Sequence, residues 1–107
     1  MTPLLRARDT LRHYRGERHA IPSASLARLL GLPSDGRQVR QLVGQLIEAG
    51  YPIGSTTAHG GGYYLIETEA ELRAAVAQVQ SRIAELQRRV ARLAEAFAEG
   101  PRQGTLA

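Results

Sequence analysis

The chain contains no cysteine, no lysine and no long apolar run. Without cysteine it can form neither a disulfide nor a thiolate metal site, and nothing points to an oxidising compartment. Its three histidines lack the spacing of metal ligands. No stretch approaches the roughly 20 apolar residues of a membrane helix, and the N-terminus lacks the apolar core of a signal peptide. We therefore expect a cytoplasmic protein without a metal or cofactor.

The sequence also contains no recognisable arrangement of catalytic residues. There is no cysteine nucleophile, no pair of aspartates and no supported Ser-His-Asp arrangement. Three successive glycines at 60–62 resemble part of a phosphate-binding loop, but the Gly-Lys-Ser/Thr of such loops does not follow and no strand-loop-helix context exists. The sequence therefore predicts a protein that is not an enzyme.

Positive charge is concentrated in the N-terminal half. The net charge is +4, and residues 1–50 hold eight arginines against four acids. Residues 51–66 carry no charge apart from His59 when it is protonated, and six arginines cancel six glutamates in residues 67–107. Nucleic-acid binding by the N-terminal half would require such a distribution. Genome composition explains the exclusive use of arginine more simply than phosphate recognition does.

Three short helices are expected, over residues 2–16, 23–31 and 34–50. Each range opens on a serine or threonine that can cap a helix and closes on a glycine that can end one. Between the first two, His19–Ile21 should be extended because it precedes a proline. The residues expected to face inward are Leu4, Ala7, Leu11, Tyr14, Leu26, Leu29, Leu30, Val39, Leu42, Val43, Leu46 and Ile47.

The third helix places polar side chains opposite its apolar face. At 100° per residue this side holds arginine, glutamine and glycine, together with Glu48. In a DNA major groove arginine suits guanine and glutamine suits adenine. Two helices joined by a tight turn, the second with such residues outward, form a helix-turn-helix pattern. An ordinary helical hairpin explains the apolar positions equally well, and only the outward residues favour DNA recognition.

A β-hairpin is expected directly after the third helix. Residues 51–56 and 62–66 are rich in aromatic and β-branched side chains, and a glycine-rich tip at 57–61 separates them. A hairpin in this position is the wing of a winged helix. The glycines allow the backbone to approach DNA closely, or they only make a flexible turn; the sequence leaves both alternatives open.

Three segments resemble a known family when they are taken together: LARLLGL at 26–32, VRQLVGQLIEAGYPI at 39–53 and GGGYYL at 60–65. They are similar to the winged helix-turn-helix of the biotin operon repressor type, over about residues 4–66. The resemblance implies this fold and binding of duplex DNA, chiefly by the second helix of the motif. The turn before Val39 is longer than is usual in the family. No ligand-binding or enzymatic domain follows, so biotin chemistry does not carry over.

The C-terminal part predicts a coiled coil. Thr68 and Glu71 form a capping box that opens a helix to about Glu99. Its apolar residues alternate at spacings of four and three, a heptad seam with β-branched a positions that favours a parallel dimer. An antiparallel pair would bring arginines together, so a parallel pair is preferred. A helix of some 45 Å is too long to be covered by folding back on its own domain, so a partner helix is expected. The seam residues are Leu72, Val76, Val79, Ile83, Leu86, Val90, Leu93 and Phe97.

The expected fold is mainly α with a small β-hairpin, a winged helix-turn-helix at 1–66, followed by a long coiled-coil helix at 68–99 and a disordered tail at 100–107. The expected function is sequence-specific binding of double-stranded DNA by a dimeric, nucleoid-associated transcriptional regulator. A winged helix that docks a protein partner is the alternative. The residues expected to contact DNA are Arg28, Ser34, Arg37, Gln38, Arg40, Gln41, Gly44, Thr57, His59 and Gly60.

Overall fold

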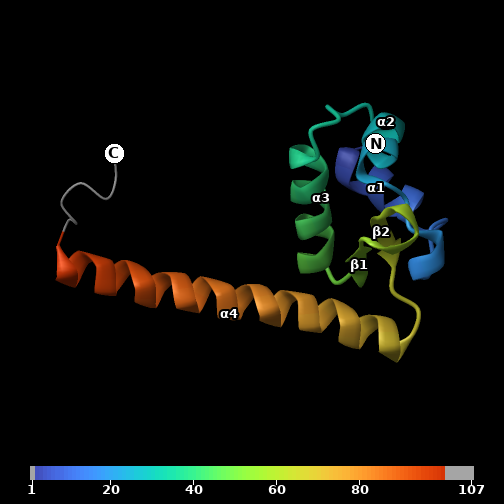
Figure 1. The fold of residues 1–107 in the computed structure, drawn as a ribbon. Coiled ribbons are helices and arrows are strands. Elements are labelled where there is room, and N and C mark those ends of the chain that lie inside the picture. Colours follow the sequence, from blue (N-terminus) through green and yellow to red (C-terminus); the bar gives the residue numbers. More distant parts are fainter. Residues whose placement is uncertain (1, 101–107) are drawn as a thin grey trace. The chain divides into compact units, whose positions relative to one another are not determined.

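The structure is a computed structural model that describes residues 2–100 (Figure 1). Its α-helices and strands are α1 (Pro3–Leu11), α2 (Ser23–Leu30), α3 (Arg37–Glu48), β1 (Ile53–Thr56), β2 (Gly62–Leu65) and α4 (Glu69–Glu99). Two 3₁₀ turns, η1 (Glu17–His19) and η2 (Ala58–Gly60), complete the described chain. The mainly α fold with a hairpin and a long C-terminal helix is therefore confirmed.

The chain divides into two compact units between Ala75 and Val76, inside α4. We call residues 2–75 the head. Its three short helices enclose an apolar core to which the hairpin adds Ile53. Burying each large aliphatic side chain stabilises the head by roughly 1.5–3 kcal/mol. The core residues are Ala7, Leu11, Ile21, Leu26, Ala27, Leu30, Val39, Val43, Leu46 and Ile53.

Two residues that were expected to face inward are exposed. Leu29 is 53% exposed and Ile47 is 50% exposed. The buried face of α2 is shared by two leucines and Ala27, so Leu29 lies beyond its edge. In α3 the buried face is centred on Val39, Val43 and Leu46, and Ile47 lies to one side of it. Both expectations were wrong because apolar spacing alone does not fix the width of a buried face.

The first helix ends earlier than its sequence suggested. Its expected cap is confirmed, since the Leu5 amide donates to the Thr2 hydroxyl over 3.2 Å. However, α1 ends at Leu11 and not at Gly16. The chain leaves the helix to pair with β2: the Leu65 amide donates to the Tyr14 carbonyl, and the Gly16 amide donates to the Leu65 carbonyl. This pairing ends α1.

The caps expected at Ser23 and Ser34 were wrong. Pro22 precedes α2 as its N-cap, and no side chain caps that helix. The third helix begins three residues later than Ser34, after Gly36, whose φ of 81° is left-handed. The Asp35 carboxylate accepts a hydrogen bond from the first amide of α3 over 3.0 Å. A tight turn therefore occupies the positions that were assigned to the first turn of the helix.

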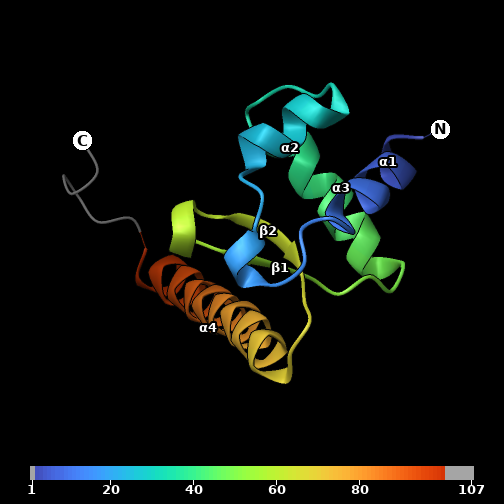
Figure 2. The same ribbon diagram turned by 90° about the vertical axis from the view of Figure 1, so that its right-hand side faces the viewer.

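The hairpin is antiparallel and is attached to the helical part of the head. Ile53 pairs with Leu65, and the register continues to Thr56 opposite Gly62. Ile21 is extended as expected, and it exchanges two backbone hydrogen bonds of 2.8 and 2.9 Å with Tyr63. The extended conformation expected for His19 was wrong, because this residue ends the η1 turn. The η1 turn also contacts both strands (Figure 2). The hairpin is thus held by backbone pairing on the side of β2.

The capping box at the start of α4 is confirmed. The Glu71 amide donates to the Thr68 hydroxyl over 3.1 Å, and the Glu71 carboxylate accepts from the Thr68 amide. The same carboxylate accepts from the amides of Glu67 and Glu17, at 2.8 and 2.9 Å. The helix ends at Glu99 as expected. The expected tail lies outside the described residues except for Gly100.

These contacts give Glu71 a measurable pH dependence. Backbone hydrogen bonds from Glu67 and Glu17, and a weaker one from Thr68, hold its pKa below the ordinary value. Its stabilisation is therefore complete above the pKa of the unfolded chain and is lost as pH falls through the lower pKa of the folded head. We expect Glu71→Gln to destabilise the head by about 1 kcal/mol at neutral pH.

Urea denaturation at a series of pH values measures this effect. The difference between the wild type and Glu71→Gln should shrink below about pH 4, near the ordinary glutamate pKa. Glu69→Gln is the matched control, because the Glu69 carboxylate is on the surface with an ion pair of 3.8 Å to Arg73. A difference that persists unchanged in acid would contradict the role given to the Glu71 carboxylate.

Candidate nucleic-acid interface and self-association seam

The exposed surface of α3 gathers five of the ten residues expected to contact DNA. Arg37, Gln38, Arg40, Gln41 and Gly44 are all exposed. Arg37, Gln41 and Gly44 lie opposite the buried face of the helix, and Gln38 and Arg40 flank it. Amphipathic spacing produces this separation, because the apolar face must cover the core. Open space surrounds Gly44, so the backbone is accessible at that position. The first turns of α3 therefore present two guanidinium and two amide groups together.

The arginines of this face are free to bind an external anion. Within residues 2–100, no carboxylate forms an ion pair with Arg37 or Arg40. The guanidinium of Arg40 and the hydroxyl of Ser23 both lie against Gly36. A side chain at position 36 would therefore press on Arg40. The left-handed turn before α3 thus also leaves space for one of its arginines.

The two positions expected to contact phosphates lie at the surface. Arg28 is exposed in the last turn of α2, and its guanidinium donates to the Ser25 hydroxyl over 3.3 Å. Ser34 is exposed in the turn before α3, although it does not cap the helix. Both polar groups are accessible to a ligand.

The tip of the hairpin exposes Thr57, His59 and Gly60. His59 adopts a left-handed φ of 54°, which is uncommon for a residue other than glycine. The Thr56 hydroxyl accepts from the Ala58 amide at 3.0 Å, and the Ala58 carbonyl accepts from the Gly61 amide at 2.8 Å. The glycines therefore form a hydrogen-bonded turn. A hollow of about 330 Å³ lies between this turn and the start of α2.

One exposed arginine in the segment that contacts the hairpin was not predicted from the sequence. Arg18 lies in η1, and η1 contacts η2 at the hairpin tip. The Thr56 hydroxyl fixes this approach by donating to the Glu17 carboxylate over 2.7 Å. No local signal could have identified Arg18, because about 40 residues separate η1 from the tip in the sequence. The hairpin itself carries no arginine, and η1 brings both the Glu17 carboxylate and Arg18 to this part of the head.

The seam of α4 is exposed at every position. Its eight large apolar side chains are between 44% and 90% exposed, from Val76 to Phe97. They recur on one side of a helix of 31 residues, which is about 46 Å long. Soluble proteins rarely leave so long an apolar stripe in water. This exposed seam indicates self-association.

The described residues offer no group of three or more metal-ligating side chains in one place. None of the helices within residues 2–100 combines the length and apolar character needed to cross a bilayer. Comparisons of the chain with known protein families, with curated proteins and with solved structures found no match.

Proposed function

We propose that this protein binds double-stranded DNA in a sequence-specific manner and acts as a dimeric transcriptional regulator with a winged helix-turn-helix head. The observation that carries the proposal is the exposed face of α3. Two arginines that have no ion-pair partner within residues 2–100 and two glutamines lie there, on a helix whose other face is buried. These are the side chains that form paired hydrogen bonds with guanine and adenine.

In this proposal α3 enters the major groove. Arg37, Gln38, Arg40 and Gln41 read base edges, and the exposed backbone at Gly44 allows close approach. Phosphate contacts come from Arg28 and Ser34, while Thr57, His59 and Gly60 meet the flanking backbone or the minor groove. Arg18 adds one further guanidinium beside the hairpin, next to the Glu17 carboxylate. Such phosphate contacts fix the register of the helix, whereas the base contacts give specificity.

The seam of α4 joins two such heads through a parallel coiled coil. Exposed apolar residues motivate the pairing, and β-branched residues at the a positions favour two parallel strands. A parallel pair also faces Arg82 with the neutral Gln87, whereas an antiparallel pair brings arginines together. Two heads would read two half-sites, so a symmetric site in DNA is expected.

The direct test combines Arg37→Ala with Arg40→Ala. We expect the double variant to bind its selected duplex about 2 to 4 kcal/mol more weakly and to show a smaller salt dependence. The duplex is first selected from a random library with the wild-type protein, and affinity is then measured by fluorescence anisotropy. Arg73→Ala with Arg92→Ala is the matched control, because it removes the same charge from α4. Absence of wild-type binding at low salt would refute the proposal.

A protein-docking module is the second candidate. It is favoured by Glu48, which lies on the exposed face of α3 and would repel phosphates, and by the absence of arginine from the hairpin. In this case the exposed face of α3 would bind a protein partner, and the coiled coil would serve only to join two copies of the chain. Recovery of one stoichiometric protein partner that Arg37→Ala and Arg40→Ala release would support it. Recovery of DNA alone would exclude it.

A further inference from the structure

The head contains a cavity that the proposed DNA contacts do not use. It has a volume of about 360 Å³ and lies between α1, the end of α3 and the base of the hairpin. Leu11 and Leu46, each 1% exposed, are buried in its floor. Ile53 and Leu65 extend this floor from the two strands. The size is at the lower end of the range for small-molecule sites, which suits a ligand of one or two rings.

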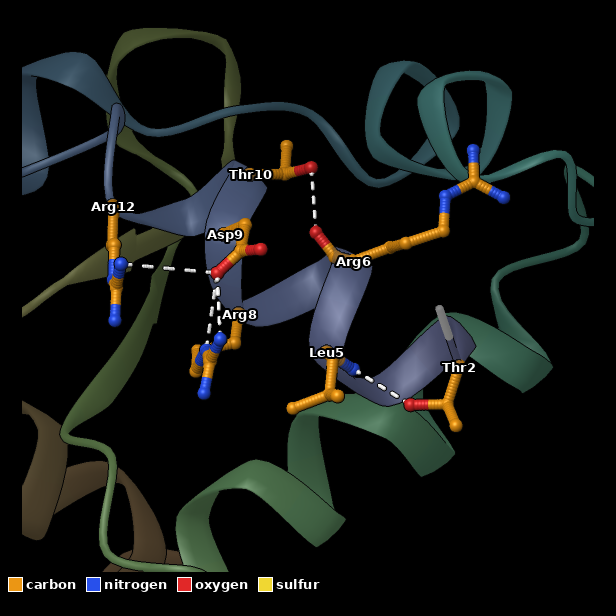
Figure 3. A network of polar contacts seen from close by, with 7 residues as sticks. All are labelled: Thr2, Leu5, Arg6, Arg8, Asp9, Thr10 and Arg12. Atoms are coloured by element: carbon orange, nitrogen blue, oxygen red, sulfur yellow. Dashed lines mark hydrogen bonds and ion pairs between the residues drawn. The ribbon is translucent and has the colours of Figure 1, made fainter.

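Three arginines line the same cavity, from α1 and the segment after it: Arg8, Arg12 and Arg15. Asp9 lies between the first two, 3.0 Å from the Arg8 guanidinium and 3.8 Å from that of Arg12 (Figure 3). Arg15 forms an ion pair of 3.2 Å with Glu67. Three cations therefore face two carboxylates, which leaves one positive charge at an apolar cavity.

The arginines differ in how firmly they are held. Hydrogen bonds to Tyr51 and Asp9 raise the pKa of Arg8, so this guanidinium is fixed at one side of the cavity. The side chains of Arg12 and Arg15 are 62% and 60% exposed and have one carboxylate neighbour each. Each guanidinium has five N–H donors, so these two keep donors for a ligand. A carboxylate at the mouth would receive paired hydrogen bonds from them.

We propose that this cavity binds a small organic monoanion, with its apolar ring system against the half-buried Leu65 and Ile66 that line the cavity. Its carboxylate lies at Arg12 and Arg15. The apolar floor distinguishes such a ligand from a DNA phosphate, which has no apolar part to bury. The cavity also lies at the Leu46 end of α3, about 10 Å along the helix from Arg40. Anion binding here is independent of the proposed DNA binding.

The test titrates the full-length, ¹⁵N-labelled protein with 1-naphthoate and follows amide shifts by NMR. Saturable shifts at Leu11, Ile53 and Leu65, with one ligand for each chain, are expected. 1-Naphthalenemethanol has the same rings without the charge and should bind about tenfold more weakly or worse. Absence of saturable shifts, equal affinity for the neutral compound, or shifts confined to residues 76–97 would each overturn the proposal.

Arg12→Gln combined with Arg15→Gln isolates the charge contribution. This double variant should raise the Kd for 1-naphthoate about tenfold or more and leave the affinity for the neutral compound unchanged. Its own amide spectrum reports whether the head is folded. Arg73→Gln with Arg92→Gln removes two arginines outside the cavity and should leave both affinities unchanged. Unchanged affinity for 1-naphthoate in a folded Arg12, Arg15 double variant would disprove the assignment.

Discussion

Ile83→Asp is expected to convert the proposed dimer into a monomer. Ile83 is an a position in the middle of the seam and is 48% exposed in the single chain. In a coiled coil, two aspartates would face each other in a dry apolar layer. Each chain of the dimer loses the free energy gained by burying the isoleucine side chain. Desolvating the two carboxylates adds a penalty of several kcal/mol. The total exceeds what a short coiled coil can offset.

Light scattering coupled to gel filtration measures the change. One chain has a mass of 11.6 kDa, so the wild type should elute at twice this mass and the variant at the single-chain value. Ser81→Asp introduces the same charge at an exposed position away from the seam and should remain dimeric. A monomeric wild type, or a dimeric Ile83→Asp variant, would contradict self-association through the seam.

Gly62→Ala is expected to destabilise the head by about 3–5 kcal/mol. Gly62 has a φ of 133°, a region that other residues rarely adopt. A methyl group on Gly62 would also collide with the backbone carbonyl of Ile21, and backbone atoms cannot move aside as a flexible side chain can. Strain and overpacking therefore add up at one position. A loss of this size is a large part of the stability of a domain of about 70 residues.

Urea denaturation followed by near-ultraviolet circular dichroism suits this measurement, since three of the four tyrosines lie in or near the hairpin. That signal reports on the head and not on the helicity of α4. Gly60→Ala is the matched control: its φ is also positive, at 87°, but open space surrounds it. It should lose only about 1–2 kcal/mol of backbone strain. Equal losses in the two variants would show that the contact with Ile21 is unimportant.

The features that the sequence predicted well depend on neighbours in the chain. The capping box needs only Thr68 and Glu71, three residues apart, and the seam needs only regular spacing along one helix. The hairpin also followed from local composition. Each of these signals is complete within a few turns or strand residues, so no knowledge of the tertiary structure was required.

The error at the end of α1 arose because distant residues decide the local structure there. Backbone pairing with Leu65 ends α1 before Gly16, and no sequence motif near Gly16 indicates this pairing. The hydrogen bonds that join Glu17 to Thr56 and Glu71 span 39 and 54 residues. The apolar floor beneath Arg12 also comes from separate elements. For this reason the candidate DNA face could be predicted from one helix, whereas the cavity could not.

The backbone pairing of Ile21 with Tyr63 has a consequence for recognition. A wing that becomes ordered only on contact loses conformational entropy at that moment, and its affinity is reduced accordingly. Here the hairpin is already bonded to the segment before α2, so the entropy is lost when the head folds. The wing therefore meets any ligand as a preformed surface. The paired amide protons of Ile21 and Tyr63 should exchange with solvent only when the head unfolds, as expected for a hairpin that is ordered before it meets a ligand.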